Sequence, residues 1–175
     1  QRNLKIYEDL AAGGGQLSPR QQYYFARELK DHGFYARAAD YFKGFLNGGQ
    51  GWLEDNIAAC YNLAQCYGAL NKTQQVLPAL LQSFRYDSPR AEICCQVGYY
   101  YKGQGDYLRA LNWFATAAAL PKGDSLGFVL QDYRGYIPHI ELAVCYYTLG
   151  NLEKPILHNE LAGQYKPDNP SVVSN

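Results

Sequence analysis

Methionine is absent from this sequence of 175 residues, and so is a net charge, because 16 lysines and arginines balance 16 aspartates and glutamates. Nucleic-acid binding needs a basic footprint, so this balance argues against nucleic acid as a partner. It argues equally against an anionic membrane surface. No run of 18 apolar residues occurs, which argues against a membrane span, and the polar first ten residues do not read as a signal peptide.

The chain begins at Gln1 and not at the methionine with which translation starts. The other end is equally abrupt. A proline-containing stretch at 166–170 is followed by 171–175, which reads as the first turn of another helix. We therefore expect a piece of a longer protein, with a truncated helix at 171–175.

The five cysteines form no metal or redox motif. There is no Cys-x-x-Cys spacing, and the adjacent Cys94 and Cys95 would point in different directions on a helix. Their number is odd, so we interpret all five as free thiols packed as small apolar groups. Free thiols indicate a reducing, cytoplasmic compartment. No metal ion or other cofactor is expected.

Helical periodicity runs along the chain, and no segment alternates like a strand. Residues 1–15 read as an N-terminal helix and a glycine linker, because three glycines cannot maintain a helix. Ser18 and Pro19 are typical of a helix start. The chain is therefore predicted to be all-α. After the linker, the expected helices cover about 19–32, 35–46, 53–70, 73–86, 89–102, 107–120, 138–149 and 152–164.

Four tight turns join these helices in pairs. Gly33, Gly105 and Gly150 occupy three of them, and Asn71, the next-best residue for a left-handed backbone, occupies the fourth. The four positions are spaced by 38, 34 and 45 residues. A helical pair that recurs about every 34 residues indicates a solenoid of stacked hairpins, here with two insertions.

The residues at equivalent places in the four copies resemble the tetratricopeptide repeat. That repeat has a large apolar residue, a small residue, a tyrosine, a glycine turn, an aromatic, an alanine, a second aromatic and a closing proline. The fourth copy departs from it at Pro155, and the second at Val76, where alanine is usual. The third copy follows the pattern best, with Val97, Gly98, Tyr101, Gly105, Tyr107, Ala110, Phe114, Ala117 and Pro121.

This resemblance implies a right-handed α-α superhelix of four helical hairpins, preceded by the N-terminal helix. Small residues would let paired helices approach closely, and large ones would fill the groove between pairs. An array cut short at its end leaves an apolar end face, so self-association is expected. The array would span 16–175, with repeats at about 19–50, 53–88, 89–121 and 138–167.

A narrower resemblance concerns the segments around the repeats. The opening RNLKIYEDLAAGG and the stretch GFVLQDYRGYIPHIELAVCYYTLGN are similar to the C-terminal repeat region of bacterial family 2 glycosyltransferases. In those enzymes a catalytic domain with an Asp-x-Asp motif precedes the repeats. This sequence contains no Asp-x-Asp, so the resemblance implies a non-catalytic accessory region that positions a partner or acceptor. A free-standing adaptor that binds a peptide is the alternative.

In tetratricopeptide arrays the first helix of each hairpin lines the concave side, where partners bind. Tyrosine and arginine are residue types that carry binding energy. Packing of the same tyrosines between helices is the alternative. The clamp with which one subgroup of the family holds a C-terminal carboxylate is not reproduced here. The repeat register places Tyr23, Arg27, Lys30, Tyr61, Gln65, Tyr99, Lys102, Ile140, Val144 and Tyr147 in this groove.

Residues 122–137 do not fit the repeat and carry three aromatic residues, Phe128, Tyr133 and Tyr136. So long a departure is unusual for a loop inside a compact array. Three hypotheses remain open for this insertion. It caps the groove, it faces a neighbouring domain, or it folds back on the array as a short extra helix.

No catalytic constellation emerges from the sequence. Adjacent carboxylates near helix ends read as solvated groups. His32 is expected at a helix C-terminus, where the helix dipole favours it, and His158 is expected on an exposed face. Cys145 and His139 are six residues apart on one helix, which is the wrong spacing for a nucleophile and its base. We therefore predict that this chain is not an enzyme and has a protein or peptide partner.

Overall fold

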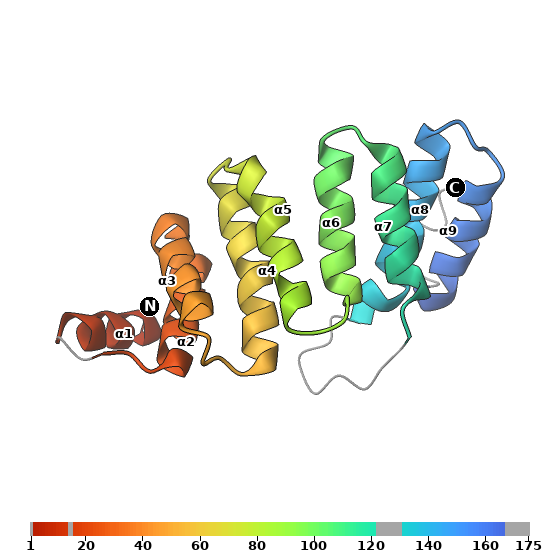
Figure 1. Ribbon diagram of the computed structural model, residues 1–175. Helices are drawn as coiled ribbons and strands as arrows, with labels where there is room; N and C mark the ends of the chain where they lie inside the picture. Colours follow the sequence, from red (N-terminus) through yellow and green to blue (C-terminus); the bar gives the residue numbers. More distant parts are fainter. Residues whose placement is uncertain (1, 14–15, 122–130, 167–175) are drawn as a thin grey trace. The chain divides into compact units, whose positions relative to one another are not determined.

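The computed structural model describes residues 2–13, 16–121 and 131–166 of the chain. Every regular element in that part of the chain is helical (Figure 1). The chain divides into two compact units, Gln1–Ser88 and Pro89–Asn175, which we describe separately. The truncated helix expected at 171–175 lies outside the described residues.

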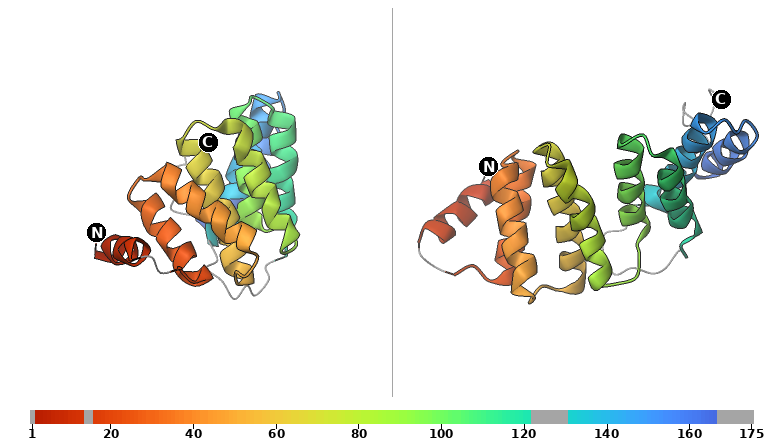
Figure 2. Two further views of the ribbon diagram at one scale, coloured as in Figure 1. Left: turned by 60° about the vertical axis from the view of Figure 1, so that its left-hand side comes forward. Right: turned by 45° about the horizontal axis from the view of Figure 1, so that its top comes forward.

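The N-terminal unit contains a single helix followed by two helical hairpins. In each hairpin the two helices run side by side, and the second helix of the first hairpin packs against the first helix of the next (Figure 1, Figure 2). The elements are α1 (Arg2–Ala12), α2 (Pro19–Asp31), α3 (Tyr35–Gly48), α4 (Leu53–Ala69), α5 (Thr73–Gln82) and the 3₁₀ turn η1 (Ser83–Arg85).

Small and large residues alternate in the core of this unit. Ala26 of α2 and Ala38 of α3 are fully buried, which lets the two helices approach closely, while Phe25 and Phe42 fill the space beside them. The single helix α1 packs against α2, where the ring of Tyr7 stacks on Phe25 with centroids 5.7 Å apart. The unit is therefore held by repeat-to-repeat packing, as the sequence pattern predicts.

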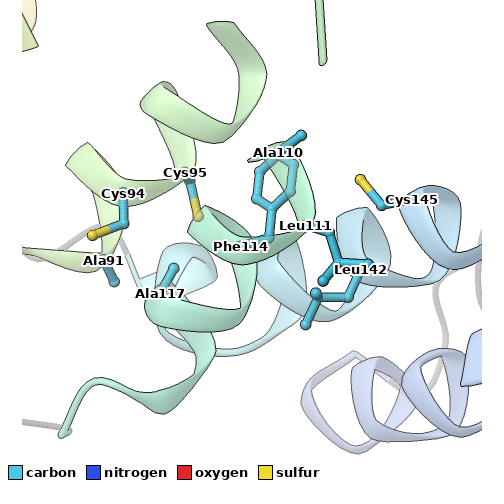
Figure 3. Close-up of a cluster of buried hydrophobic side chains, with 9 residues drawn as sticks. All are labelled: Ala91, Cys94, Cys95, Ala110, Leu111, Phe114, Ala117, Leu142 and Cys145. Carbon is cyan, nitrogen blue, oxygen red and sulfur yellow. The ribbon is translucent and has the colours of Figure 1, made fainter. Parts of the chain in front are cut away.

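The C-terminal unit contains two more hairpins and a short 3₁₀ helix between them. Its core gathers between α6, α7 and α8 (Figure 3). Phe114 is fully buried there, and a side chain on Gly98 would lie within 2.7 Å of its ring. The elements are α6 (Ala91–Gly103), α7 (Tyr107–Ala119), η2 (Gln131–Arg134), α8 (Tyr136–Thr148) and α9 (Lys154–Tyr165).

All four predicted turn residues have a left-handed backbone, which confirms that part of the repeat interpretation. The φ angles are 80° at Gly33, 57° at Asn71, 75° at Gly105 and 83° at Gly150. In each turn the next amide donates to a carbonyl five residues upstream, as when the amide of Asn151 donates to Tyr146. This bond closes the first helix of the hairpin and directs the chain into the second.

Several predicted helix boundaries were wrong by two or more residues. The helix expected at 89 begins at Ala91, because Arg90 has an extended backbone with φ −107° and ψ 148°. The helix expected at 138 begins at Tyr136, so the end of the predicted insertion belongs to α8. The helix expected over 73–86 ends at residue 82 and tightens into η1.

The start of α9 also differs from the prediction, at residue 154 instead of 152. The side-chain oxygen of Asn151 accepts hydrogen bonds from the amides of Glu153 at 3.1 Å and Lys154 at 2.9 Å. These bonds satisfy amides that a helix start leaves without partners. Pro155 then fits the first turn, which needs no amide donor there.

We expect the Asn151→Ala substitution to lower the free energy of unfolding by about 1 kcal/mol, the usual value of a helix-capping side chain. Urea denaturation followed by circular dichroism measures this change. Gln164→Ala, at an exposed position on the same helix, is the matched control and should change stability little. Equal effects of the two substitutions would show that Asn151 does not cap α9.

Candidate interaction surface

Two arginines and a tyrosine form a ridge along α2 of the N-terminal unit. The guanidinium of Arg20 lies 5.7 Å from the ring centroid of Tyr24, and that of Arg27 lies 5.6 Å from the same ring. Both arginines are exposed. Of these three residues, the repeat register predicts only Arg27 as a groove residue. The spacing i, i+4, i+7 of Arg20, Tyr24 and Arg27 could have identified all three as sharing one helix face.

Lys30 lies farther along the same helix and links it to the next hairpin. Its ammonium donates to the side-chain oxygen of Asn62 at 2.5 Å and to that of Gln65 at 3.0 Å, both on α4. The amide of Asn62 in turn donates to the backbone carbonyl of Ala58. The structure thus brings Lys30 and Gln65, both predicted groove residues, into contact.

The tyrosines predicted for this part of the groove differ in exposure. Tyr23 is only 4% exposed and packs beside Phe42 and Phe45, so it contributes packing more than surface. Burial raises its pKa to about 12, and the phenol stays protonated. Tyr61 is half-buried on α4. Packing between helices, the alternative for these tyrosines, therefore describes Tyr23.

In the C-terminal unit, Tyr99 and Lys102 of α6 meet Glu141 of α8. The ammonium of Lys102 donates to the Glu141 carboxylate, and this ion pair is half-buried. Burial, and then the negative charge of Glu141, raises the pKa of Tyr99. These two predicted groove residues thus join two hairpins and leave part of their surface exposed.

Helix α8 carries the most exposed tyrosine of the predicted groove. Tyr147 is 68% exposed, and Val144, one turn before it, is 39% exposed. The opposite face of the same helix is buried through Leu142, Ala143 and Cys145. The side chains of Tyr147 and Val144 therefore contribute little to the core of this unit.

The described end of the insertion folds back onto its own unit. The amide of Gln96 on α6 donates to the hydroxyl of Tyr133 at 3.2 Å, and Tyr133 packs against the core of the unit. Lys166 lies 4.6 Å from the ring centroid of Tyr136 and pairs with Asp132 at 2.6 Å. Of the three hypotheses, these contacts match a short extra helix. Phe128 lies outside the described residues.

Three exposed apolar side chains lie at the start of α9 or just before it. Leu152, Ile156 and Leu157 are all more than half exposed. The chain continues beyond α9 into residues outside the described part. Self-association through an apolar end face stays a prediction.

Two histidines, 19 residues apart in the sequence, meet in the last hairpin. His139 of α8 and His158 of α9 are joined by a hydrogen bond between their Nδ1 atoms at 3.1 Å. The ring of His158 stacks on Tyr146, with centroids 5.4 Å apart. The prediction that His158 is exposed was wrong, because its ring packs against His139 and Tyr146 of α8. His32 lies at the C-terminal cap of α2, as predicted.

The five cysteines are free and buried, which confirms their interpretation as small apolar groups. Burial raises the pKa of Cys60 to about 12 and that of Cys145 to about 11, so these thiols are poor nucleophiles. Among residues 2–13, 16–121 and 131–166, no group of three or more histidines, cysteines or carboxylates could hold a metal ion. No helix in these same ranges is both long and apolar enough to cross a membrane.

Comparison with solved structures defines the fold. YrrB, described as a TPR protein with an unusual peptide-binding site, has a TM-score of 0.69 and 20% identity over 99% of this chain and 81% of its own. TTC0263, a TPR protein of Thermus thermophilus, has a TM-score of 0.66 and 19% identity over 98% of this chain and 85% of its own. This chain has the tetratricopeptide-repeat fold.

MamA from Desulfovibrio magneticus RS-1 is a further structural neighbour, with a TM-score of 0.71 and 15% identity over 95% of this chain and 85% of its own. The tetratricopeptide assignment confirms the predicted all-α hairpin solenoid. No protein-family model matches the sequence, and no curated protein matches it at a significant level. The resemblance to glycosyltransferases is therefore still a prediction.

Proposed function

We propose that this chain is a non-catalytic interaction region that binds a protein or peptide partner on the exposed faces of α2, α4, α6 and α8. The observation that carries the proposal is Tyr147, an aromatic residue that is 68% exposed beside Val144. Tyrosine is enriched where binding energy concentrates. The fold supports this function, since solenoids use such faces to bind partners, and the neighbour YrrB is described as having a peptide-binding site.

Capture of partners from a cell extract by the immobilised chain tests this proposal. We expect Tyr147→Ser to reduce the amount of captured partner strongly, because a central tyrosine contributes about 2 kcal/mol, roughly 30-fold in affinity. Quantitative mass spectrometry measures the captured proteins. Leu108→Ser is the matched control, because Leu108 is 62% exposed but lies on α7, the second helix of its hairpin. Equal capture by the two variants would overturn the proposal.

We also propose that the chain is an accessory region of a bacterial family 2 glycosyltransferase and positions a partner or acceptor for its catalytic domain. The sequence resemblance supports this, above all the stretch that forms η2 and the start of α8. The gene sequence upstream of Gln1 tests it. An α/β domain with an Asp-x-Asp motif is expected there, and a stop codon would instead favour the alternative, a free-standing adaptor.

A further inference from the structure

The pair of His139 and His158 brings two metal-ligating nitrogens together from different helices. Their Nδ1 atoms are 3.1 Å apart, and the 5.3 Å between the ring centroids exceeds this by about two ring radii, so the rings meet edge to edge. Two nitrogen ligands held about 2.0–2.1 Å from a tetrahedral zinc ion are themselves about 3.3 Å apart. The two Nδ1 atoms therefore already have nearly the spacing of two ligands on one metal ion.

Both histidines are in the protonation state that metal binding requires. Burial lowers the pKa of His139, and burial, His139 and Lys154 lower that of His158, so both rings are mainly neutral at pH 7. A metal ion competes with a proton for the same nitrogen lone pair, so a neutral histidine binds metal more readily. Imidazole suits Zn²⁺ and Cu²⁺, whereas Mg²⁺ prefers oxygen ligands.

Two tyrosines hold the histidine rings in place. Tyr146 lies parallel to His158, with an interplanar angle of 7° and centroids 5.4 Å apart. The centroid of Tyr165 is 6.2 Å from that of His139, and its ring lies directly against Gly135, which has no side chain to displace it. Rings that are already fixed lose less conformational freedom when they bind an ion. Both histidines are only half-buried, so water can reach the space between them.

One cation opposes a metal ion at this place. The ammonium of Lys154 lies 4.6 Å from the ring centroid of Tyr146 and 3.5 Å from its hydroxyl. It is close enough to His158 to lower the pKa of that ring. Lys154 is exposed, so water and salt screen its charge. We therefore expect Lys154 to weaken metal binding without preventing it.

We propose that His139 and His158 form an open site for a divalent ion of the zinc and copper class, which both Nδ1 atoms bind. The pair supplies two of the four ligands of a tetrahedral ion, and water completes the set. The histidine that donates the hydrogen bond between the rings moves its proton from Nδ1 to Nε2, so no proton is released. The ion links α8 to α9. This inference goes beyond the proposed function and does not depend on it.

Isothermal titration calorimetry of the untagged full chain with zinc chloride at pH 7 tests the proposal. We expect one zinc ion to bind per chain, and Cu²⁺ to bind more tightly than Zn²⁺, as the usual order of metal affinities requires. Magnesium chloride at the same concentrations should give no binding. Because the ion joins two helices of the folded chain, the urea midpoint should rise with the zinc concentration.

Variants locate the ion. We expect His139→Gln and His158→Gln each to weaken zinc binding at least about 10-fold, since the loss of a mere supporting partner of a ligand already costs about that much. The control is His32→Gln, which removes the third histidine of the chain from the other unit and should change the affinity less than about 2-fold. Lys154→Gln should strengthen binding about 2-fold, as expected for an exposed charge.

Nitrogen-15 NMR of the histidine rings separates a ligand role from a structural one. On zinc binding, both His139 and His158 should carry their proton on Nε2, and both Nδ1 resonances should shift while that of His32 does not. Three results would overturn the proposal. These are no zinc binding, equal zinc binding by the wild-type and double-glutamine chains, and zinc binding that leaves the two Nδ1 resonances unchanged.

Discussion

The Phe114→Ala substitution is expected to lower the free energy of unfolding of the C-terminal unit by roughly 3–5 kcal/mol, the range for removing a buried phenylalanine. Phe114 is fully buried and packs edge-on against Tyr99, with centroids 5.3 Å apart. Gly98 fits directly against the ring because it has no side chain. The truncated residue would leave a cavity that the helices could close only by moving together.

Urea denaturation followed by circular dichroism measures this loss. The matched control is Leu108→Ala on the same helix, which removes an exposed side chain and should cost little. If Phe114→Ala cost no more than the control, the contact between Gly98 and Phe114 would not hold α6 against α7. The repeat packing described for this unit would then be wrong.

A fall in pH from 7 to 5 is expected to destabilise the hairpin of α8 and α9 through its paired histidines. Their Nδ1 atoms are 3.1 Å apart while the ring centroids are 5.3 Å apart, so the rings meet through these nitrogens. One nitrogen donates and the other accepts when both rings are neutral. Two protonated rings would place two N–H donors against each other, beside the ammonium of Lys154.

The direction of this effect follows from the pKa values. Burial lowers the pKa of His139, and burial, His139 and Lys154 together lower that of His158. An unfolded histidine titrates near pH 6.5, so below that pH the unfolded chain takes up protons that the folded chain does not. The free energy of unfolding therefore begins to fall when the pH drops below about 6.5. It stops falling once the pH is below the lowered pKa values of the two folded histidines.

The expected loss between pH 7 and pH 5 is on the order of 1 kcal/mol, because both rings reach solvent and their charges are partly screened. Urea denaturation at the two pH values measures it. The double substitution of His139 and His158 by glutamine is the control for carboxylates that titrate in the same range. An equal loss in the wild-type and double-substituted chains would show that the histidine pair does not respond to pH.

The sequence predicted the hairpins well because their determinants are local. A turn such as the one at Asn71 needs a residue that tolerates positive φ, and Gly98 is small because the ring of Phe114 lies against it. Both requirements recur at a fixed spacing. The ends of helices were predicted less well, because they depend on single side chains that bond the terminal amides. The amides of Glu153 and Lys154 are bonded by the Asn151 side chain just before α9, and no periodicity indicates those bonds.

The candidate surface was harder to predict than the fold, because exposure depends on what packs across a groove. The repeat register alone predicts both Tyr23 and Tyr147 as groove residues. In the structure Tyr23 is buried against phenylalanines, whereas Tyr147 is far more exposed. The pairing of His139 with His158 joins residues of different helices, and their sequence separation carries no signal of it. Spacing along one helix, by contrast, could have revealed Arg20 and Tyr24.

Hydrogen exchange on the full chain, with and without a captured partner, tests the central claim most directly. Binding on the first helix of each hairpin predicts added protection from exchange in α2, α4, α6 and α8. Protection confined to α3, α5, α7 and α9 would contradict the claim, because those are the second helices of the hairpins.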